Sequence, residues 1–129
     1  MGKRGFTLVE LIAVVIILGI LMAVGIPQYR RAMERSRGAE AYSVLAAIQT
    51  AEQLYHEEYE TYTTSLAQLG VTAPNKYWNT TIAANGGIGN GFIASSNRLT
   101  SPFCATRLVT LDERGTKGGN WEACVDGIQ

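Results

Sequence analysis

Glu10 is the one charged residue in an otherwise apolar stretch of 21 residues that runs from Phe6 to Ile26. As a helix this stretch would be about 31 Å long, which is the thickness of the hydrocarbon core of a bilayer. A carboxylate inside a bilayer costs roughly 2.5–3.5 kcal/mol on insertion scales, so it is normally retained for a partner. The residue type and its position therefore predict a charge-pairing role for Glu10.

Two simpler interpretations of the same stretch remain open. In the first, it is a plain single-span anchor, and Glu10 is tolerated without a role. In the second, it is a secretory signal, because Ala23-Val24-Gly25 is a small-x-small triplet of the kind that precedes a signal-peptidase cut. The length of the run and the acid within it disfavour the signal peptide.

Cys104 and Cys124 are the two cysteines of the chain, and they enclose 19 residues. An even count beyond a membrane segment predicts one disulfide in an oxidising compartment, and closing such a loop stabilises a small domain by roughly 3 kcal/mol. A metal pair and a reactive thiol are the alternatives, but further ligands are missing nearby. The acids Asp112, Glu113 and Asp126 are too scattered to predict a calcium site. We therefore expect neither a metal nor a cofactor.

The remaining candidates for chemistry are weak. His56 is the only histidine, and it lies beside two glutamates without a nucleophile nearby, so we expect an exposed helix residue. Asn79-Thr80-Thr81 is formally a glycosylation sequon, and the glycine-rich run 86–91 lacks the lysine of a phosphate-binding loop. The sequence predicts no catalytic activity.

Composition sets the outer limits. The 129 residues carry no net charge, and removal of Lys3 and Arg4 would leave nine basic residues against eleven acidic ones. That balance does not predict nucleic-acid binding. Four arginines follow the apolar stretch, and lipid headgroups or acids of a neighbouring copy are their expected partners. These are Arg30, Arg31, Arg35 and Arg37.

A single long helix is expected to position Glu10. The apolar stretch continues past Pro27 into an amphipathic run, which predicts a helix from Phe6 to about Tyr59, roughly 80 Å long. Proline removes one helical hydrogen bond and bends the axis. Residues at a spacing of three or four predict the buried face of the second half, namely Leu45, Ile48, Glu52, Tyr55, Tyr59 and Tyr62.

A small β-sheet is expected to cover that face. A short capped helix ending at Gly70 would come first. Short strand-like segments separated by turn-rich connections then predict three or four antiparallel strands, with one face on the helix. The expected strands are Tyr77–Ala83, Gly91–Ser95, Leu108–Asp112 and Trp121–Val125, and the expected turns include 85–87 and 117–120. The predicted fold class is α+β: a long N-terminal helix on a small antiparallel sheet, with a C-terminal disulfide loop.

The N-terminal residues Gly5-Phe6-Thr7-Leu8-Val9-Glu10, followed by an apolar helix, closely resemble the start of type IV prepilins and pseudopilins. The resemblance implies cleavage after Gly5 by a membrane prepilin peptidase, which also methylates the new N-terminus, Phe6. It implies that Glu10 pairs with the N-terminal amine of a neighbouring subunit. It further implies that the helix between Gly19 and Pro27 can lose helicity in assembled filaments.

The resemblance also implies an organisation and a location. Residues 1–5 would be a basic leader, 6–27 the transmembrane and polymerisation helix, and 28–129 the periplasmic or extracellular domain. The chain would cross the bacterial inner membrane once with a cytoplasmic N-terminus, since the short basic leader stays inside. Its partners would be the bilayer, the peptidase, other pilin subunits in a homopolymer, and an assembly platform driven by an ATPase.

Three functions follow from these features. The first is a structural subunit of a type IV pilus-like filament, which the predicted disulfide favours because pilins resembling this chain carry a C-terminal bridge. The second is a pseudopilin of a type II secretion or DNA-uptake system. The third, from another class, is a monomeric membrane-anchored binding module.

Overall fold

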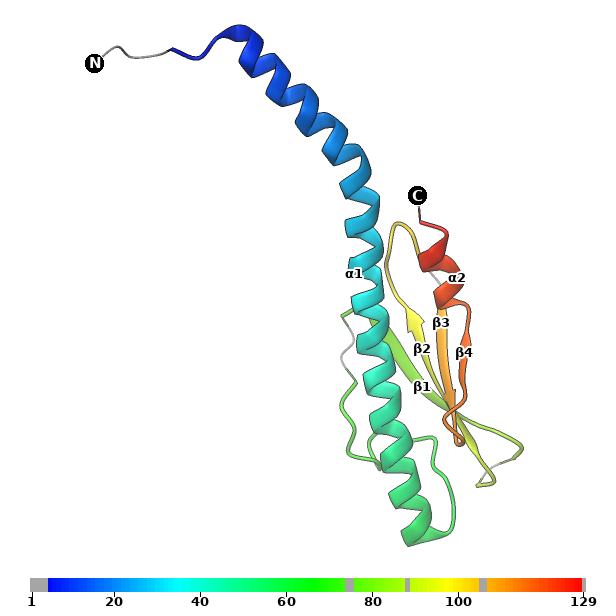
Figure 1. Cartoon of the computed structure of the whole chain (residues 1–129). Coiled ribbons are helices and arrows are strands. Elements are labelled where there is room, and N and C mark those ends of the chain that lie inside the picture. Colours follow the sequence, from blue (N-terminus) through cyan, green and yellow to red (C-terminus); the bar gives the residue numbers. More distant parts are fainter. Residues whose placement is uncertain (1–4, 74–75, 88, 105–106, 129) are drawn as a thin grey trace.

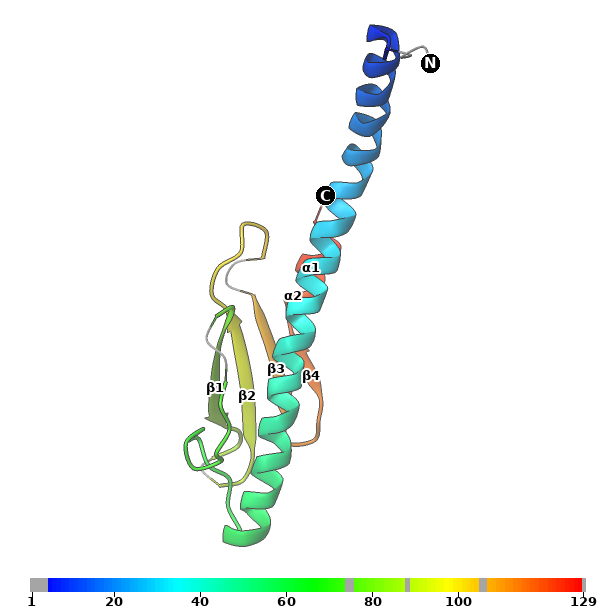
Figure 2. The same cartoon turned by 90° about the vertical axis from the view of Figure 1, so that its left-hand side faces the viewer.

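The long helix dominates the computed structural model, which describes residues 5–73, 76–87, 89–104 and 107–128 (Figure 1). Helix α1 (Leu8–Tyr59) contains 52 residues. Two perpendicular views show that only its C-terminal half runs beside the sheet, while its N-terminal half extends away from the rest of the chain (Figure 1, Figure 2). The predicted helix is confirmed to within two residues.

Local chemistry explains where α1 begins and ends. Thr7 is the N-cap, and the Thr7-x-x-Glu10 sequence forms a capping box. At the other end, Glu60 adopts the left-handed conformation with φ 56°, and its N–H donates to the carbonyl of His56 at 2.8 Å. The helix continues through Pro27, and its axis curves along the apolar half (Figure 1).

The buried face of α1 follows a regular spacing of four and three residues. Such a spacing keeps one stripe of a helix against a partner layer. Of the predicted face, Leu45, Ile48 and Glu52 are fully buried and Tyr55 is half-buried. Tyr59 was predicted wrongly: it is 56% exposed, because the helix ends there beyond the edge of the sheet. The buried residues of α1 are Glu34, Gly38, Ala41, Leu45, Ile48 and Glu52.

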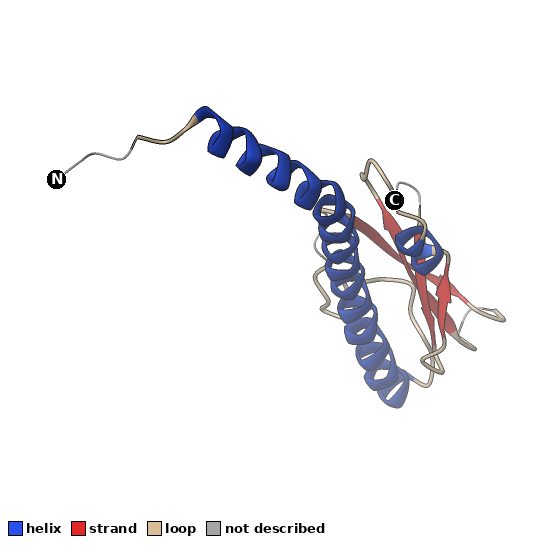
Figure 3. Cartoon of the chain, turned by 45° about the horizontal axis from the view of Figure 1, so that its top comes forward, coloured by secondary structure: helices blue, strands red, loops and turns tan. Residues whose placement is uncertain are grey.

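The sheet is an antiparallel meander of four strands, in the order β1-β2-β3-β4 (Figure 2). This confirms the predicted strand number and direction. Figure 3 shows its strands in red beside the second half of the long helix. Strands β1 and β2 alternate between buried and more exposed residues, so one face of the sheet packs on α1. The strands are β1 (Trp78–Ala84), β2 (Phe92–Arg98), β3 (Leu108–Asp112) and β4 (Lys117–Gly119).

The C-terminal region differs from the prediction in two places. Lys117–Gly119, expected as a turn, is strand β4 and pairs with β3; its three residues are all exposed, so no apolar pattern marks it. Residues Trp121–Val125, expected as a strand, lie in helix α2 (Trp121–Asp126). Trp121 and Val125 are the buried pair, four residues apart, which is a helical spacing.

The predicted helix before Gly70 is also wrong. Residues 66–70 form successive turns, in which the N–H of Gln68 donates to the carbonyl of Ser65 at 3.1 Å. Gly70 has a φ of 65°, the left-handed conformation that glycine adopts readily. The segment therefore reverses the chain without completing a helix.

Helix α2 docks on α1 where α1 lacks a side chain. A Cβ at Gly38 would overlap the indole of Trp121, so only glycine allows this close approach. The Trp121 ring meets the Trp78 ring edge to face, with centroids 5.0 Å apart, and Trp78 Nε1 donates to the carbonyl of Arg37 at 2.9 Å. Two tryptophans thus join α1, β1 and α2.

Candidate functional site

The Glu10 carboxylate is held at the N-terminal end of α1 by Thr7. Its Oε2 accepts from the backbone N–H of Thr7 at 2.9 Å and from Thr7 Oγ1 at 2.8 Å. In return, the N–H of Glu10 donates to Thr7 Oγ1 at 3.3 Å. The carboxylate therefore lies one residue from Phe6, at the end of the helix nearest the Gly5–Phe6 bond.

Thr7 is a contact of the candidate site that the sequence analysis missed. The signal was present, because Thr-x-x-Glu before an apolar run is the sequence signature of a capping box. The structure brings Thr7 and Glu10 together, whereas Gly5 and Phe6 are exposed and outside the helix. The Gly5–Phe6 bond therefore lies exposed in front of the capped helix.

The described parts of the chain leave the apolar half of α1 uncovered. Every residue from Leu8 to Ile26 is exposed, Gly19 and Gly25 included. Among the residues that the structure describes, α1 is the one helix long and apolar enough to cross a membrane. This half of the helix can be covered only by lipid or by other protein chains.

The disulfide prediction is confirmed. Cys104 and Cys124 are bonded, with Cα atoms 5.9 Å apart, and the bridge connects the segment after β2 to helix α2. Cys104 is fully buried. The covalent bond therefore closes the part of the domain nearest the apolar half of α1 (Figure 1).

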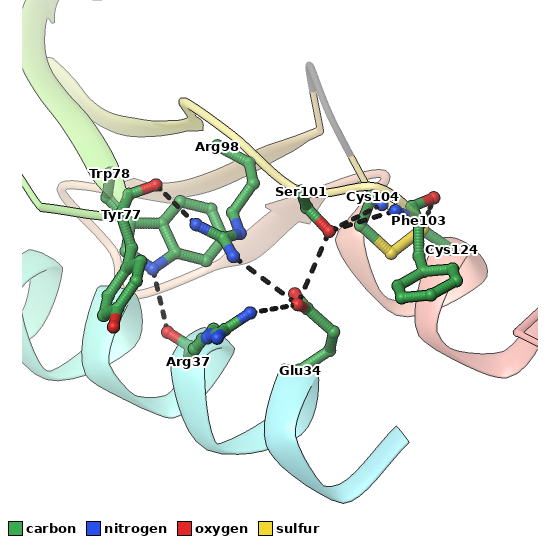
Figure 4. Close-up of polar contacts among 9 residues, drawn as sticks. All are labelled: Glu34, Arg37, Tyr77, Trp78, Arg98, Ser101, Phe103, Cys104 and Cys124. Atoms are coloured by element: carbon green, nitrogen blue, oxygen red, sulfur yellow. Dashed lines mark hydrogen bonds and ion pairs between the residues drawn. A yellow bond between two sulfur atoms is a disulfide. The ribbon is translucent and has the colours of Figure 1, made fainter. Parts of the chain in front are cut away.

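A buried ion pair ties the disulfide region to α1 (Figure 4). Oε1 of Glu34 is 3.5 Å from Nη2 of Arg98, and both side chains are buried. The same oxygen bonds to Arg37 and accepts from Ser101 Oγ at 3.4 Å. Ser101 Oγ in turn accepts from the N–H of Cys104 at 3.0 Å. One carboxylate oxygen on α1 thus contacts residues from β2, from the disulfide segment and from α1 itself.

The four arginines beyond the apolar stretch all have contacts within the chain. Arg31 Nε donates to the carbonyl of Ile128 at 2.7 Å, and Arg35 lies 3.4 Å from the Asp126 carboxylate. Arg37 pairs with Glu34, and the guanidinium of Arg30 lies 4.8 Å from the ring centre of Phe103. The partners that the sequence predicted for these arginines, lipid headgroups or acids of a neighbouring copy, stay a prediction.

The acids of the C-terminal half do not converge. Asp112 Oδ1 accepts from the N–H groups of Thr116 and Arg114 at 2.6 and 3.1 Å, and the bond from Thr116 lowers the pKa of Asp112 below its usual range. Glu113 accepts from Asn85, while Asp126 faces Arg35. Within the described ranges, no group of three potential metal ligands gathers.

His56 is half-buried, so its predicted exposure is wrong in part. Its ring stacks on that of Tyr62, with centroids 4.5 Å apart. The Tyr62 ring also packs against the ring of Phe92, with centroids 5.4 Å apart. These contacts give His56 a packing role beside the end of α1.

Comparison with known proteins gives consistent matches. Residues 1–26 match the prokaryotic N-terminal methylation motif. The chain is 30% identical over 125 residues to fimbrial protein EcpC of Eikenella corrodens, covering 93% of this chain and 81% of that protein. It is 38% identical over 86 residues to the type IV major pilin protein PilA of Myxococcus xanthus, covering 65% of this chain but 39% of the relative.

A solved structure matches the fold. The non-core minor pilin PilV of Neisseria meningitidis superposes with a TM-score of 0.53 at 23% identity, covering 68% of this chain and 87% of that one. At this identity the likeness supports the fold alone, while the sequence match to EcpC extends over nearly the whole chain. Together with the long helix, the antiparallel sheet and the disulfide, these matches show that the chain belongs to the type IV pilin family.

Proposed function

We propose that the chain is a structural subunit of a type IV pilus-like filament, assembled from the bacterial inner membrane after removal of its leader. The observation that carries this proposal is the exposure of the whole apolar half of α1, with its single acid capped at the start. The type IV pilin relatives and an apolar helix half that the described residues leave uncovered support the same role. The chain itself needs no catalysis for it.

The physics of assembly is a transfer between two apolar surroundings. Before assembly, lipid covers the apolar half of α1, and in a filament the same surface packs on the helices of other subunits. Lipid tails are as apolar as these side chains, so the hydrophobic effect alone does not favour one state. A polar contact made only between subunits is therefore the feature that can favour the filament.

Glu10 is suited to that contact. Cleavage between Gly5 and Phe6 would leave an α-amine on Phe6, next to the Thr7 N–H that already bonds to the Glu10 carboxylate. The cap holds the acid at the helix end, in one orientation. An amine from a neighbouring, axially displaced subunit then completes the pair and fixes the register between the two. Methylation of the Phe6 amine by the peptidase leaves its positive charge in place.

The proposed organisation follows from this mechanism. Residues 1–5 form the leader, 6–27 the membrane and polymerisation helix, and 28–129 the domain outside the inner membrane, on the filament surface after assembly. Pro27 has no N–H to donate to the carbonyl one turn earlier, so the helix has fewer hydrogen bonds near Pro27 than elsewhere. The stretch from Gly19 to Pro27 is accordingly the part that we expect to lose helicity when a filament is stretched.

The substitution Glu10→Gln tests the charge pair. The variant keeps size and polarity but leaves the neighbouring amine without its anion in an apolar core, which costs several kcal/mol for buried pairs. We expect fibre yield to fall at least about tenfold, while leader cleavage and membrane level stay unchanged. Sheared fibres and membrane fractions would be quantified together. Glu57→Gln, an exposed acid on the same helix, is the matched control.

Normal fibre yield from Glu10→Gln would contradict the mechanism. A mature N-terminus at Ile26, measured by intact mass, would instead favour a secretory signal. A pseudopilin of a type II secretion or DNA-uptake system would form fibres that remain in the periplasm, so the presence of this chain in surface fibres separates the two filament roles. A monomeric anchored module would form none.

A further inference from the structure

A groove lies between α1 and the segment that precedes Cys104, close to the end of the apolar stretch. Its volume is about 260 Å³. Aromatic and aliphatic side chains line it together with two cations and a buried acid. The lining residues are Tyr29, Arg30, Met33, Glu34, Arg37, Pro102 and Phe103.

The polar groups of this groove leave a net positive charge. Arg30 and Arg37 line the groove together with one acid, Glu34, whose carboxylate pairs with Arg37 and with Arg98. Arg30 is exposed and, within the described residues, its recorded contact is with the Phe103 ring. Its guanidinium donors are therefore available to an anion. Oε2 of Glu34 is buried and accepts no hydrogen bond from the part of the chain that the structure describes.

A second hollow borders this groove, on the apolar part of α1. It has a volume of about 320 Å³, is lined by apolar residues and shares Tyr29 with the first. Gly25 adds no side chain to it. Along the axis, the hollow from Leu18 to Ile26 extends about 12 Å, most of the ~15 Å thickness of one leaflet's hydrocarbon. Its lining is Leu18, Leu21, Met22, Gly25, Ile26 and Tyr29.

The two hollows lie at the membrane depths of a lipid's headgroup and of its acyl chains. If Ile26 marks the edge of the hydrocarbon, Arg30 lies about 6 Å beyond it, since each residue rises 1.5 Å. The headgroup layer of a bilayer is about 5–7 Å thick on each side. The cationic hollow therefore lies at headgroup depth and the apolar hollow at the depth of the acyl chains.

We propose that these two neighbouring hollows together bind one anionic phospholipid of the phosphatidylglycerol class. This inference rests on the proposed function, because it requires the chain to be inserted in a membrane. Arg30 donates to the phosphate. An acyl chain lies along the apolar hollow below Tyr29. Charge complementarity favours a phosphate ester as the occupant, because the groove carries two arginines against one acid that is already paired.

The test uses the full chain in nanodiscs made of phosphatidylglycerol and phosphatidylcholine. Gentle release of the protein and native mass spectrometry count the lipid molecules retained per chain. We expect one retained phosphatidylglycerol for the unaltered chain and about tenfold less for Arg30→Gln, because a charge-assisted bond is lost. Arg35→Gln is the matched control: it removes the same charge from an exposed arginine that lines a different hollow, beside Asp126.

Two outcomes overturn the inference. One is equal retention in Arg30→Gln and Arg35→Gln, which would indicate a general attraction of the basic residues to anionic lipid. The other is a covalent dimer, in place of a lipid adduct, when a photo-crosslinking phenylalanine derivative replaces Phe103 in the membrane-bound chain. Flotation with vesicles separates the two proposals: a chain that inserts without retaining lipid contradicts only the lipid site, and a chain that fails to insert contradicts membrane anchoring itself.

Discussion

The two halves of α1 share one continuous backbone but are built for different surroundings. From Leu8 to Ile26 no residue is buried, whereas from Glu34 to Glu52 one residue in every three or four is buried against the sheet. The backbone hydrogen bonds of a helix do not depend on whether its side chains are buried, so the helix continues from the exposed half into the buried half. The comparison shows that a segment can be helical without being buried by its own chain. Both halves of α1 are helical, but only the second half has residues buried against the sheet.

The acids of the two halves are placed in opposite ways. In the apolar half, Glu10 is exposed in the isolated chain, and its bonds come from Thr7 nearby in sequence. In the amphipathic half, Glu34 and Glu52 are buried, with partners from Arg98 and Thr63. The buried acids thus have partners inside the chain, while in our proposal Glu10 receives its final partner from another subunit.

The sharpest way to separate the halves is to remove the first. A fragment that begins at Gln28 keeps every buried residue of α1, the sheet and the disulfide. We expect it to be a soluble monomer of mixed α/β content, while the full chain requires detergent, because the exposed apolar surface is gone. Sedimentation and circular dichroism measure both properties. Aggregation of the fragment would show that the second half also depends on the first.

Within that fragment, two leucines of α1 sharpen the comparison. Leu45 is fully buried and Leu54 is 63% exposed, on the same helix. Leu45→Ala should lower the free energy of unfolding by about 3 kcal/mol, since it leaves a cavity against the sheet. Leu54→Ala should change it by less than about 0.5 kcal/mol. Urea denaturation of both variants checks this, and similar losses would mean that the sheet does not pack on α1 as described.

The smallest expected effect concerns Glu52 and pH. Burial raises the pKa of Glu52 above its ordinary value of 4.5, partly offset by the bond from the Thr63 N–H at 3.1 Å. A raised pKa means that the fold favours the neutral acid. Its contribution to stability is therefore fully present below pH 4.5 and is lost as the pH rises through the folded pKa.

In Glu52→Gln this loss should be absent, so the variant's stability should fall less than that of the unaltered fragment as the pH rises above about 4.5. Denaturation midpoints at a series of pH values measure the difference. Glu57→Gln, an exposed position one and a half turns away, should keep the original pH dependence. Parallel curves for Glu52→Gln and the unaltered fragment would contradict the raised pKa.

Strong periodic signals explain what the sequence alone could predict. The apolar run and the Leu45 stripe predicted α1 to within two residues, and the β-branched and apolar residues of Leu108–Asp112 predicted β3 at its observed bounds. The cysteine count predicted the bridge, and the prepilin-like start predicted the family. Each of these signals can be read from residue types and their spacing alone.

The rest depended on contacts between distant residues or on too weak a pattern. Strand β4 contains two glycines and no buried residue, so only its pairing with β3 defines it. In α2, Trp121 and Val125 are spaced for a helix, but a segment of six residues gives too few turns to distinguish the two periods. The Glu34–Arg98 pair joins residues 64 positions apart, and no local rule predicts it.

The bonds at Arg31 and Glu34 have a mechanical consequence. Arg31 holds the carbonyl of Ile128, beyond Cys124, and Glu34 holds Ser101, before Cys104. The segments on either side of the disulfide therefore bond to residues in the same turn of α1. The disulfide joins these two segments covalently. A force that pulls this segment off the helix is therefore shared between the two attachments.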